Sequence, residues 1–276
     1  MALLLSFLAV LPVEPEAQGQ GVSIPNFWDP GERLAKPDMD TVGRIRFLTT
    51  TDFPPFNFID RKRRLTGFHV DLARAICAEL GILPKCQIQA VPWDELATAI
   101  EKGDGEAIIA GMDVTPDTVS RYEFSRPFMR IPARLVARRE DAITEPIYVK
   151  ARRLETGLVS GSAHEKWFTA SFPGFRTRSF PTRQEALESL RKDEIDLVFS
   201  DALSLSFWLQ SPASADCCNF AGSAYIGDGS IAQNLVIAFP KGRTDLSSAA
   251  DYALKEINDK GIFAELYLRY FPLGLY

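Results

Sequence analysis

The sequence contains few of the residues that build metal and catalytic centres. It has two histidines, His69 and His164, and four cysteines, and no pair of them shows the C-x-x-C or H-x-x-x-H spacing common in zinc sites. It also lacks a G-x-S-x-G elbow, an H-E-x-x-H motif and a phosphate-binding loop. We therefore expect no metal, no cofactor and no catalytic residue.

An excess of positive charge is also absent. The chain has 31 Lys and Arg against 36 Asp and Glu, a formal net charge of −5. Nucleic-acid binding requires clustered Lys and Arg, so nucleic acid is not an expected partner. The one basic cluster, at residues 61–64 (RKRR), lies between two strand-like segments and is predicted to form a solvated turn.

Long apolar runs are missing as well. Residues 2–11 form an apolar stretch too short to cross a bilayer as a finished helix, and it fits the apolar region of a secretory signal. We predict a signal-like segment at 1–17 and a flexible leader at 18–43, which is rich in Pro, Gly, Asp and Gln. The expected location is periplasmic, with the mature protein soluble and monomeric.

The remainder is long and apolar enough for two domains. The chain has 276 residues, of which 46% are hydrophobic, so each of two lobes can hold a core. Strand-like and helix-like segments alternate at 44–50, 67–80, 87–91, 94–102 and 106–110. A second series follows at 156–160, 164–171, 184–191 and 195–200, then a strand at 235–239 and a helical region at 245–268 interrupted at Gly261. This order predicts parallel α/β sheets, which bind ligands at the carboxyl ends of strands.

The cysteines allow one plausible disulfide. In an oxidising compartment Cys77 can pair with Cys86, joining the end of a helix to the next strand. The adjacent Cys217 and Cys218 remain unassigned, because disulfides between neighbouring residues are uncommon.

Five segments carry a resemblance to a known family. They are 51–56 (TDFPPF), 65–73 (LTGFHVDLA), 110–116 (AGMDVTP), 124–128 (FSRPF) and 195–201 (IDLVFSD). In this order and spacing the chain resembles the extracellular solute-binding proteins of polar amino-acid ABC importers. The resemblance implies two α/β lobes joined by two crossing strands, with lobe 1 at 44–135 and 236–276 and lobe 2 at 139–232. It also implies a small-molecule ligand held in the cleft, hinge closure and an ABC permease as partner.

The resemblance suggests roles for several residues. Phe53 corresponds to an aromatic residue that stacks on the ligand, and Trp93 to a residue that lines the cleft. Asp201 corresponds to the Asp that pairs with the ligand's ammonium group. Gly161 and Ser162, at a helix start, suit a carboxylate.

Each of these roles has a structural alternative. Phe53 and Trp93 can simply fill the core, as we expect of Phe56. Asp201 can cap the following helix, and Gly161 and Ser162 can form an ordinary helix cap.

The segment 111–118 departs from the family pattern. Gly111, Met112, Asp113 and Thr118 are expected to line the cleft, but the family has Ser or Thr at the position of Asp113 and a carboxylate-binding Arg at that of Thr118. Arg121 can replace the missing guanidinium, the ligand can carry a cationic group held by Asp113 and Asp201, or Asp113 can turn away and cap the next helix. We favour the cationic ligand.

Two other functions fit the same fold. Cyclohexadienyl dehydratases are similar to these binding proteins and use a cleft acid for elimination, for which Asp113 is a candidate. A free-standing ligand sensor is the other alternative. We favour a transport receptor over an enzyme.

Overall fold

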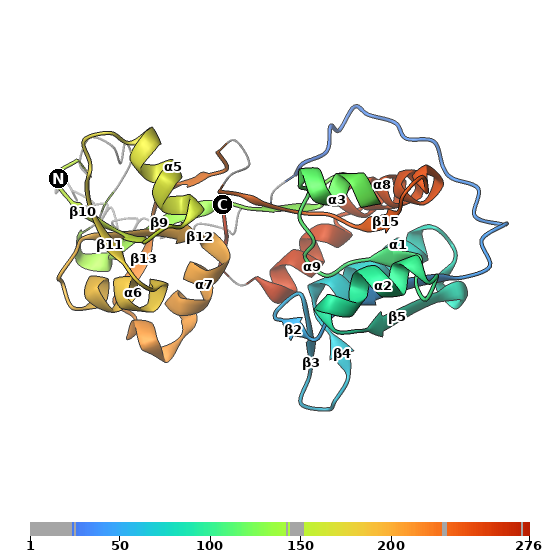
Figure 1. Cartoon of the computed structure of the whole chain (residues 1–276), viewed down its shortest axis with the longest axis horizontal. Helices are drawn as coiled ribbons and strands as arrows, with labels where there is room; N and C mark the ends of the chain where they lie inside the picture. The colour runs from blue at the N-terminus through green and yellow to red at the C-terminus, as the bar shows by residue number, and fades with distance from the viewer. Residues whose placement is uncertain (1–23, 25, 142, 144–151, 228–230, 272) are drawn as a thin grey trace, which may run out of the picture.

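Two five-stranded sheets form separate lobes in the computed structural model, which describes residues 24, 26–141, 143, 152–227, 231–271 and 273–276 (Figure 1). The sheet of lobe 1 has the order β5 (Cys86–Ala90), β1 (Ile45–Thr49), β6 (Ala107–Ile108), β15 (Ala238–Pro240) and β7 (Tyr122–Phe124). Strand β1 runs parallel to β5 and β6, whereas β15 runs antiparallel to β6 and β7. The predicted α/β alternation is confirmed in this lobe.

Helices cover the sheet of lobe 1. They are α1 (Phe68–Glu79), α2 (Leu96–Glu101), α3 (Pro116–Arg121), α8 (Thr244–Asp259) and α9 (Ile262–Tyr270), with 3-10 turns η1 (Leu83–Lys85) and η2 (Trp93–Glu95). In α1, Leu72 and Ile76 lie one turn apart and are buried in the core of the lobe. Gly261, with φ +75°, separates α8 from α9, so the predicted interruption is confirmed. The expected Cys77–Cys86 disulfide is present and ties α1 to β5.

The sheet of lobe 2 has the order β11 (Arg176–Phe180), β10 (Glu155–Val159), β12 (Leu197–Asp201), β9 (Ala133–Arg138) and β13 (Cys218–Tyr225). Strand β10 runs parallel to β11 and β12, and β9 runs antiparallel to β12 and β13. The helices are α5 (Ala163–Ser171), α6 (Arg183–Arg191) and α7 (Ala202–Gln210), with 3-10 turns η3 (Arg139–Asp141) and η4 (Pro212–Ser214).

A two-stranded antiparallel ribbon, β8 (Met129–Ile131) with β14 (Gln233–Leu235), joins the lobes. The predicted end of lobe 1, at residue 135, falls inside β9, whose residues all pair with strands β12 and β13 of lobe 2. The single strand expected at 235–239 is also wrong, because β14 ends at Leu235 and β15 starts at Ala238 in another sheet. Both differences arise because buried apolar residues continue through the crossings, namely Met129 and Ile131 in β8 and Leu235 to Ile237 from the end of β14 onward, so hydrophobicity alone does not mark where one sheet ends.

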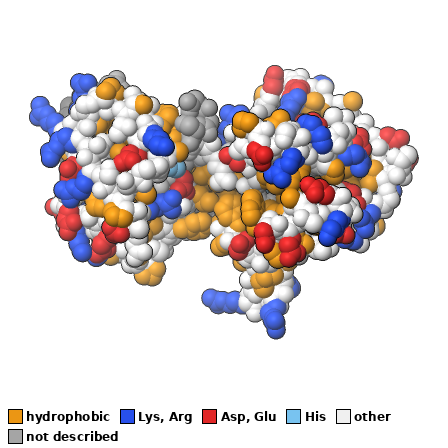
Figure 2. Space-filling model, viewed as in Figure 1, with side chains coloured by type: hydrophobic (Ala, Val, Ile, Leu, Met, Phe, Trp, Pro, Cys, Tyr) orange, Lys and Arg blue, Asp and Glu red, His pale blue; other side chains and the backbone are white. Residues whose placement is uncertain are grey.

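A small three-stranded antiparallel sheet projects from lobe 1 (Figure 1). It consists of β2 (Asp52–Phe53), β3 (Asn57–Ile59) and β4 (Leu65–Thr66). Residues 61–64 are exposed at its tip, where Figure 2 shows a group of basic side chains, and Arg64 forms an ion pair with Asp60 at 2.9 Å. The predicted solvated turn is confirmed.

The leader requires a correction. Although residues 18–43 were expected to be flexible, the part from residue 26 to 42 packs against lobe 1, with Trp28 and Met39 buried in its core. Glu32 forms an ion pair with Arg126 at 2.6 Å, and the Arg126 guanidinium lies 5.4 Å from the centre of the Trp28 ring. Composition favoured flexibility, but two widely spaced apolar side chains anchor the segment. The signal-like segment at 1–17 lies outside the described residues.

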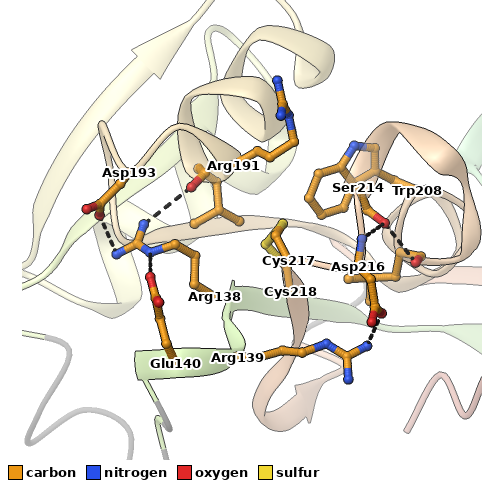
Figure 3. The surroundings of a disulfide bond; sticks show 12 residues. Arg138, Arg139, Glu140, Arg191, Asp193, Trp208, Ser214, Asp216, Cys217 and Cys218 are labelled. Atoms are coloured by element: carbon orange, nitrogen blue, oxygen red, sulfur yellow. Dashed lines mark hydrogen bonds and ion pairs between the residues drawn. A yellow bond between two sulfur atoms is a disulfide. The ribbon is translucent and has the colours of Figure 1, made fainter.

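A second disulfide joins Cys217 to Cys218 at the start of β13 (Figure 3). Beside it, the buried Arg138 side chain forms ion pairs with Asp193 at 2.8 Å and Asp141 at 2.9 Å. This group fixes the end of lobe 2 away from the ribbon. No helix of the described chain combines the length and apolarity needed to cross a bilayer.

Candidate functional site

A cavity of about 400 Å³ lies between the lobes, beside the ribbon. Phe53 and Asp113 line it from lobe 1, His164 and Asp201 from lobe 2, and Gln233 from strand β14. Apolar side chains gather at the waist between the lobes in Figure 2. The structure therefore brings Phe53, Asp113 and Asp201, all predicted from the sequence, to one cleft.

Phe53 forms one wall of the cleft, and Gly111, which was predicted to line it, lies against the Phe53 ring outside the cavity lining. The Phe53 ring stacks on Phe56, with ring centres 4.7 Å apart, and Phe56 is fully buried as expected of a core residue. Gly111 has φ +86°, and its carbonyl accepts a hydrogen bond of 3.1 Å from the side-chain amide of Gln233. Lobe 1 is thus linked to the ribbon directly behind the Phe53 ring.

Asp113 lines the cleft and does not cap the helix that follows. Its Oδ1 accepts a 2.8 Å hydrogen bond from the backbone N–H of Val114, and no ion pair to it exists among the described residues. The cap of α3 is Thr115, whose Oγ1 accepts from the backbone N–H of Thr118 at 3.2 Å. The Thr118 hydroxyl donates to the Asp113 carbonyl at 3.0 Å, so Thr118 supports the loop and does not line the cavity.

Three further residues lie away from the cavity. Arg121, considered as a substitute guanidinium, forms an ion pair with Asp117 at 3.0 Å and lines neither cavity described here. Met112 is buried in a core cluster of lobe 1. Trp93 is 54% exposed in η2 and also lies outside both cavities.

Asp201 is the last residue of β12, and its carboxylate accepts hydrogen bonds from two donors of lobe 2. Its Oδ1 accepts a 2.7 Å hydrogen bond from the backbone N–H of Ser204 and thereby caps α7. Its Oδ2 accepts a 2.7 Å bond from Nη2 of Arg183. The cap and the cleft position therefore coexist, and the carboxylate already has a cationic partner.

At the start of α5, the hydrogen-bonding groups of Gly161 and Ser162 are taken by Glu165, an acidic residue of the same helix. The backbone N–H of Gly161 donates to Oε2 of Glu165 at 2.7 Å, and Ser162 Oγ accepts from the Glu165 N–H at 3.0 Å. A hydrogen bond from Ser179 and the Gly161 N–H hold the pKa of Glu165 below its usual value. The ordinary cap is thus what the structure has at this position, and Gly161 N–H is not available to an anion.

A second cavity, of about 290 Å³, lies in lobe 2 next to the first. Ser162, Arg183 and Ser200 line it, and His164 lines both cavities. Burial lowers the pKa of His164, which keeps the ring neutral. Its Nε2 is buried and has no hydrogen-bond partner among the described residues, so a polar group is present here that a ligand can satisfy.

Sequence reasoning missed Arg183 and Gln233. Arg183 is the first residue of α6 and follows β11 through a short turn, so it also lies at the carboxyl end of a parallel strand. The position of Arg183 after a strand could be used only if β11 was recognised from the sequence. It was not recognised, because Arg176 to Ser179 are all exposed and lack the apolar pattern of a strand. No group of three or more His, Cys, Asp or Glu that could hold a metal occurs in the described ranges.

Known proteins are similar to this chain in sequence and in architecture. The pattern of the bacterial extracellular solute-binding proteins, family 3, matches residues 45–273. ABC transporter arginine-binding protein 1 of Escherichia coli (strain K12) is 25% identical over 231 residues, covering 83% of this chain and 91% of that protein.

Solved structures have the same two-lobed fold. The L-cystine solute receptor of Neisseria gonorrhoeae, in its unliganded open conformation, has a TM-score of 0.73 at 17% identity, covering 86% of this chain and 96% of that one. An ancestral cyclohexadienyl dehydratase has a TM-score of 0.68 at 20% identity, covering 87% and 99%. At such identities the likeness establishes the fold alone, and it confirms the predicted two-lobed architecture.

Proposed function

This chain belongs to the bacterial extracellular solute-binding proteins, family 3, and we propose that it is the exported receptor of an ABC importer for an amino acid with a cationic side chain. In this proposal the two lobes close on the ligand, and the closed monomer delivers it to a permease in the inner membrane. The protein binds its ligand and catalyses no reaction.

The charge of the cleft carries the proposal. Among the described residues that line the two cavities, the carboxylate and guanidinium side chains are those of Asp113, Asp201 and Arg183. Arg183 compensates Asp201, which leaves Asp113 as an uncompensated carboxylate facing the cleft. A cation about 4 Å from Asp113 gains roughly 4 kcal/mol at an effective dielectric constant of about 20, before desolvation costs. A ligand with one net positive charge therefore matches this cleft.

The other lining residues suit the rest of such a ligand. The Phe53 ring offers an aromatic face to a guanidinium or to an aliphatic chain. His164 Nε2, on lobe 2, can accept a hydrogen bond from an ammonium group next to Asp201. The similarity to an arginine-binding protein of E. coli supports the same class of ligand.

Isothermal titration calorimetry with a panel of amino acids tests the proposal. We expect arginine, lysine or ornithine to bind with a dissociation constant of about 1 μM or lower, at least about tenfold more tightly than glutamine or glutamate. Small-angle scattering should show a smaller radius of gyration with the ligand, as expected of lobe closure. Prephenate and arogenate should be recovered unchanged after incubation with the protein. Tight binding of an acidic amino acid, or turnover of either compound, would contradict the proposal.

A further inference from the structure

We propose that Arg183 receives the α-carboxylate of the ligand from lobe 2, in place of the guanidinium that the family has at the position of Thr118. The inference rests on the proposed function, because it requires an amino acid in the cleft. It makes Arg183 a specificity-determining residue, which distinguishes amino acids from the corresponding amines. Asp201 and Arg183 together then form one double site for a zwitterionic head group.

The two other places for a carboxylate are unavailable. Thr118 has no positive charge, and its hydroxyl is bound to the Asp113 carbonyl and the α3 cap. The Gly161 N–H at the start of α5 donates to Glu165. The uncompensated Asp113 repels an anion on the lobe 1 side of the cleft. A carboxylate therefore meets neither a guanidinium at Thr118 nor a free N–H at Gly161, the two strongest partners that the family resemblance suggested.

Arg183 is placed to fill this gap. Its Nε donates to Ser200 Oγ at 2.9 Å and its Nη2 to Asp201 at 2.7 Å, which fixes the plane of the guanidinium. Nη1 has no hydrogen bond within the described part of the chain, and the side chain is 40% exposed and lines the lobe 2 cavity. No other Lys or Arg of the described residues lines either cavity. The group is thus held in position and still has donor capacity directed at a ligand.

The zwitterionic head group of an amino acid can bind beside the Arg183–Asp201 ion pair without leaving either residue's charge unpaired. The ligand ammonium group lies against Asp201 and His164 Nε2, and its carboxylate lies against Arg183, so each charge meets its opposite. An amine without a carboxylate has only the first of these contacts, and it competes with Arg183 for the Asp201 oxygens. Hydrogen bonds between charged groups contribute about 1.5–3 kcal/mol, so the carboxylate should improve binding by about 10- to 150-fold.

Calorimetry with L-arginine and agmatine, its decarboxylated amine, tests Arg183 directly. The wild-type protein should bind arginine at least about tenfold more tightly than agmatine. In Arg183→Gln this ratio should fall to about three or less, chiefly through weaker binding of arginine, and Arg183→Lys should restore part of the ratio because it keeps the charge. The control Arg121→Gln, in which the removed guanidinium pairs with Asp117 outside both cavities, should keep the wild-type ratio.

The outcomes separate this inference from the proposed function. If Arg183→Gln folds with an unchanged melting temperature and keeps the wild-type ratio, the carboxylate is held elsewhere and the inference is wrong. If Arg183→Gln binds both arginine and agmatine more tightly than the wild-type protein, and by the same factor, then Arg183 only neutralises Asp201. The inference is wrong in that case too. If the panel identifies a non-cationic amino acid, the cationic ligand fails, but that amino acid and its own decarboxylated amine give the same test of Arg183. If no amino acid binds, both proposals fail.

Discussion

The Phe53 ring lies against Gly111, so closely that a Cβ atom at Gly111 would stand 2.6 Å from Cε1 of Phe53. Gly111 also has φ +86°, a conformation that other residues adopt only with strain. Two independent features thus require glycine at this position. The contact sets the height of the ring at the cleft wall.

Gly111→Ala should therefore displace the Phe53 ring and weaken ligand binding by at least about tenfold, with a loss of about 2–3 kcal/mol in the free energy of unfolding. Gly103→Ala is the matched control, because Gly103 has φ +74° but nothing within 4 Å of its added Cβ. It should cost about 1–2 kcal/mol from backbone strain and leave the affinity unchanged. Urea denaturation and calorimetry measure the two effects. Equal affinities of both variants would show that the ring position is unimportant for binding.

Asp113→Asn should weaken the binding of a cationic amino acid by about 10- to 100-fold, because an amide keeps the shape of the side chain but loses its charge. Asp117→Asn is the control, since Asp117 forms its ion pair with Arg121 on the exposed surface of α3. We expect this control to bind like the wild-type protein. Calorimetry at pH 7 compares the three proteins. Unchanged affinity in Asp113→Asn would mean that the cationic group of the ligand lies elsewhere.

Phe53 and Phe56 stack on each other but should respond differently to truncation. Phe56 has no exposed surface, so Phe56→Ala should lower the free energy of unfolding by about 3–5 kcal/mol. Phe53 is only partly buried and lines the cleft, so Phe53→Ala should cost about 1 kcal/mol of stability and at least about tenfold in affinity. Denaturation curves and ligand titrations of both variants separate the two roles. A large stability loss in Phe53→Ala with unchanged binding would make Phe53 a core residue.

Asp251 should make stability fall as pH rises. Burial raises the pKa of its carboxyl from 3.8 to about 6, so between these values the folded protein holds a proton that the unfolded chain releases. Folding is therefore penalised progressively from about pH 4 to pH 6, and the penalty is complete above that range. Asp251→Asn removes the charge and keeps an oxygen for the Arg126 N–H.

Melting temperatures across this range test the pH effect. Asp251→Asn should match the wild-type protein near pH 4 and become more stable than it above pH 6. Asp245→Asn should behave in the opposite way, because a hydrogen bond from Arg243 lowers the pKa of Asp245 and the ionised carboxylate stabilises the fold. That variant should be less stable than wild type at pH 7 and approach it in acid. Parallel pH profiles of the two variants would contradict the assignment.

Much of the fold follows from local sequence patterns. The apolar spacing in 67–80 and the glycine at 261 predicted helices that the structure contains, because both signals act within a few residues. The polar strand β11 and the buried leader residue Trp28 could not be predicted in this way. Their positions depend on partners far along the chain.

The same distinction applies to the candidate site. Asp201 ends a strand-like segment, so a rule about strand ends selects it, whereas Asp113 was selected through the family resemblance. The ion pair between Arg183 and Asp201 is a tertiary arrangement with no local signal. The capture of the Gly161 N–H by Glu165 is local, and the S-x-x-E spacing of Ser162 and Glu165 is a helix-cap signature that the sequence reasoning did not use. These arrangements change the expected chemistry of the cleft, since they remove one anion-binding position and supply another.

The ribbon between the lobes has a kinetic consequence. Since β8 and β14 are hydrogen-bonded to each other over three residue pairs, neither crossing strand can bend independently of the other. If the lobes close as proposed, we therefore expect them to rotate about one axis and an enclosed ligand to leave only when they open. The residence time of the bound ligand should then equal the lifetime of the closed conformation. Single-molecule fluorescence energy transfer between one dye on each lobe would record each release event.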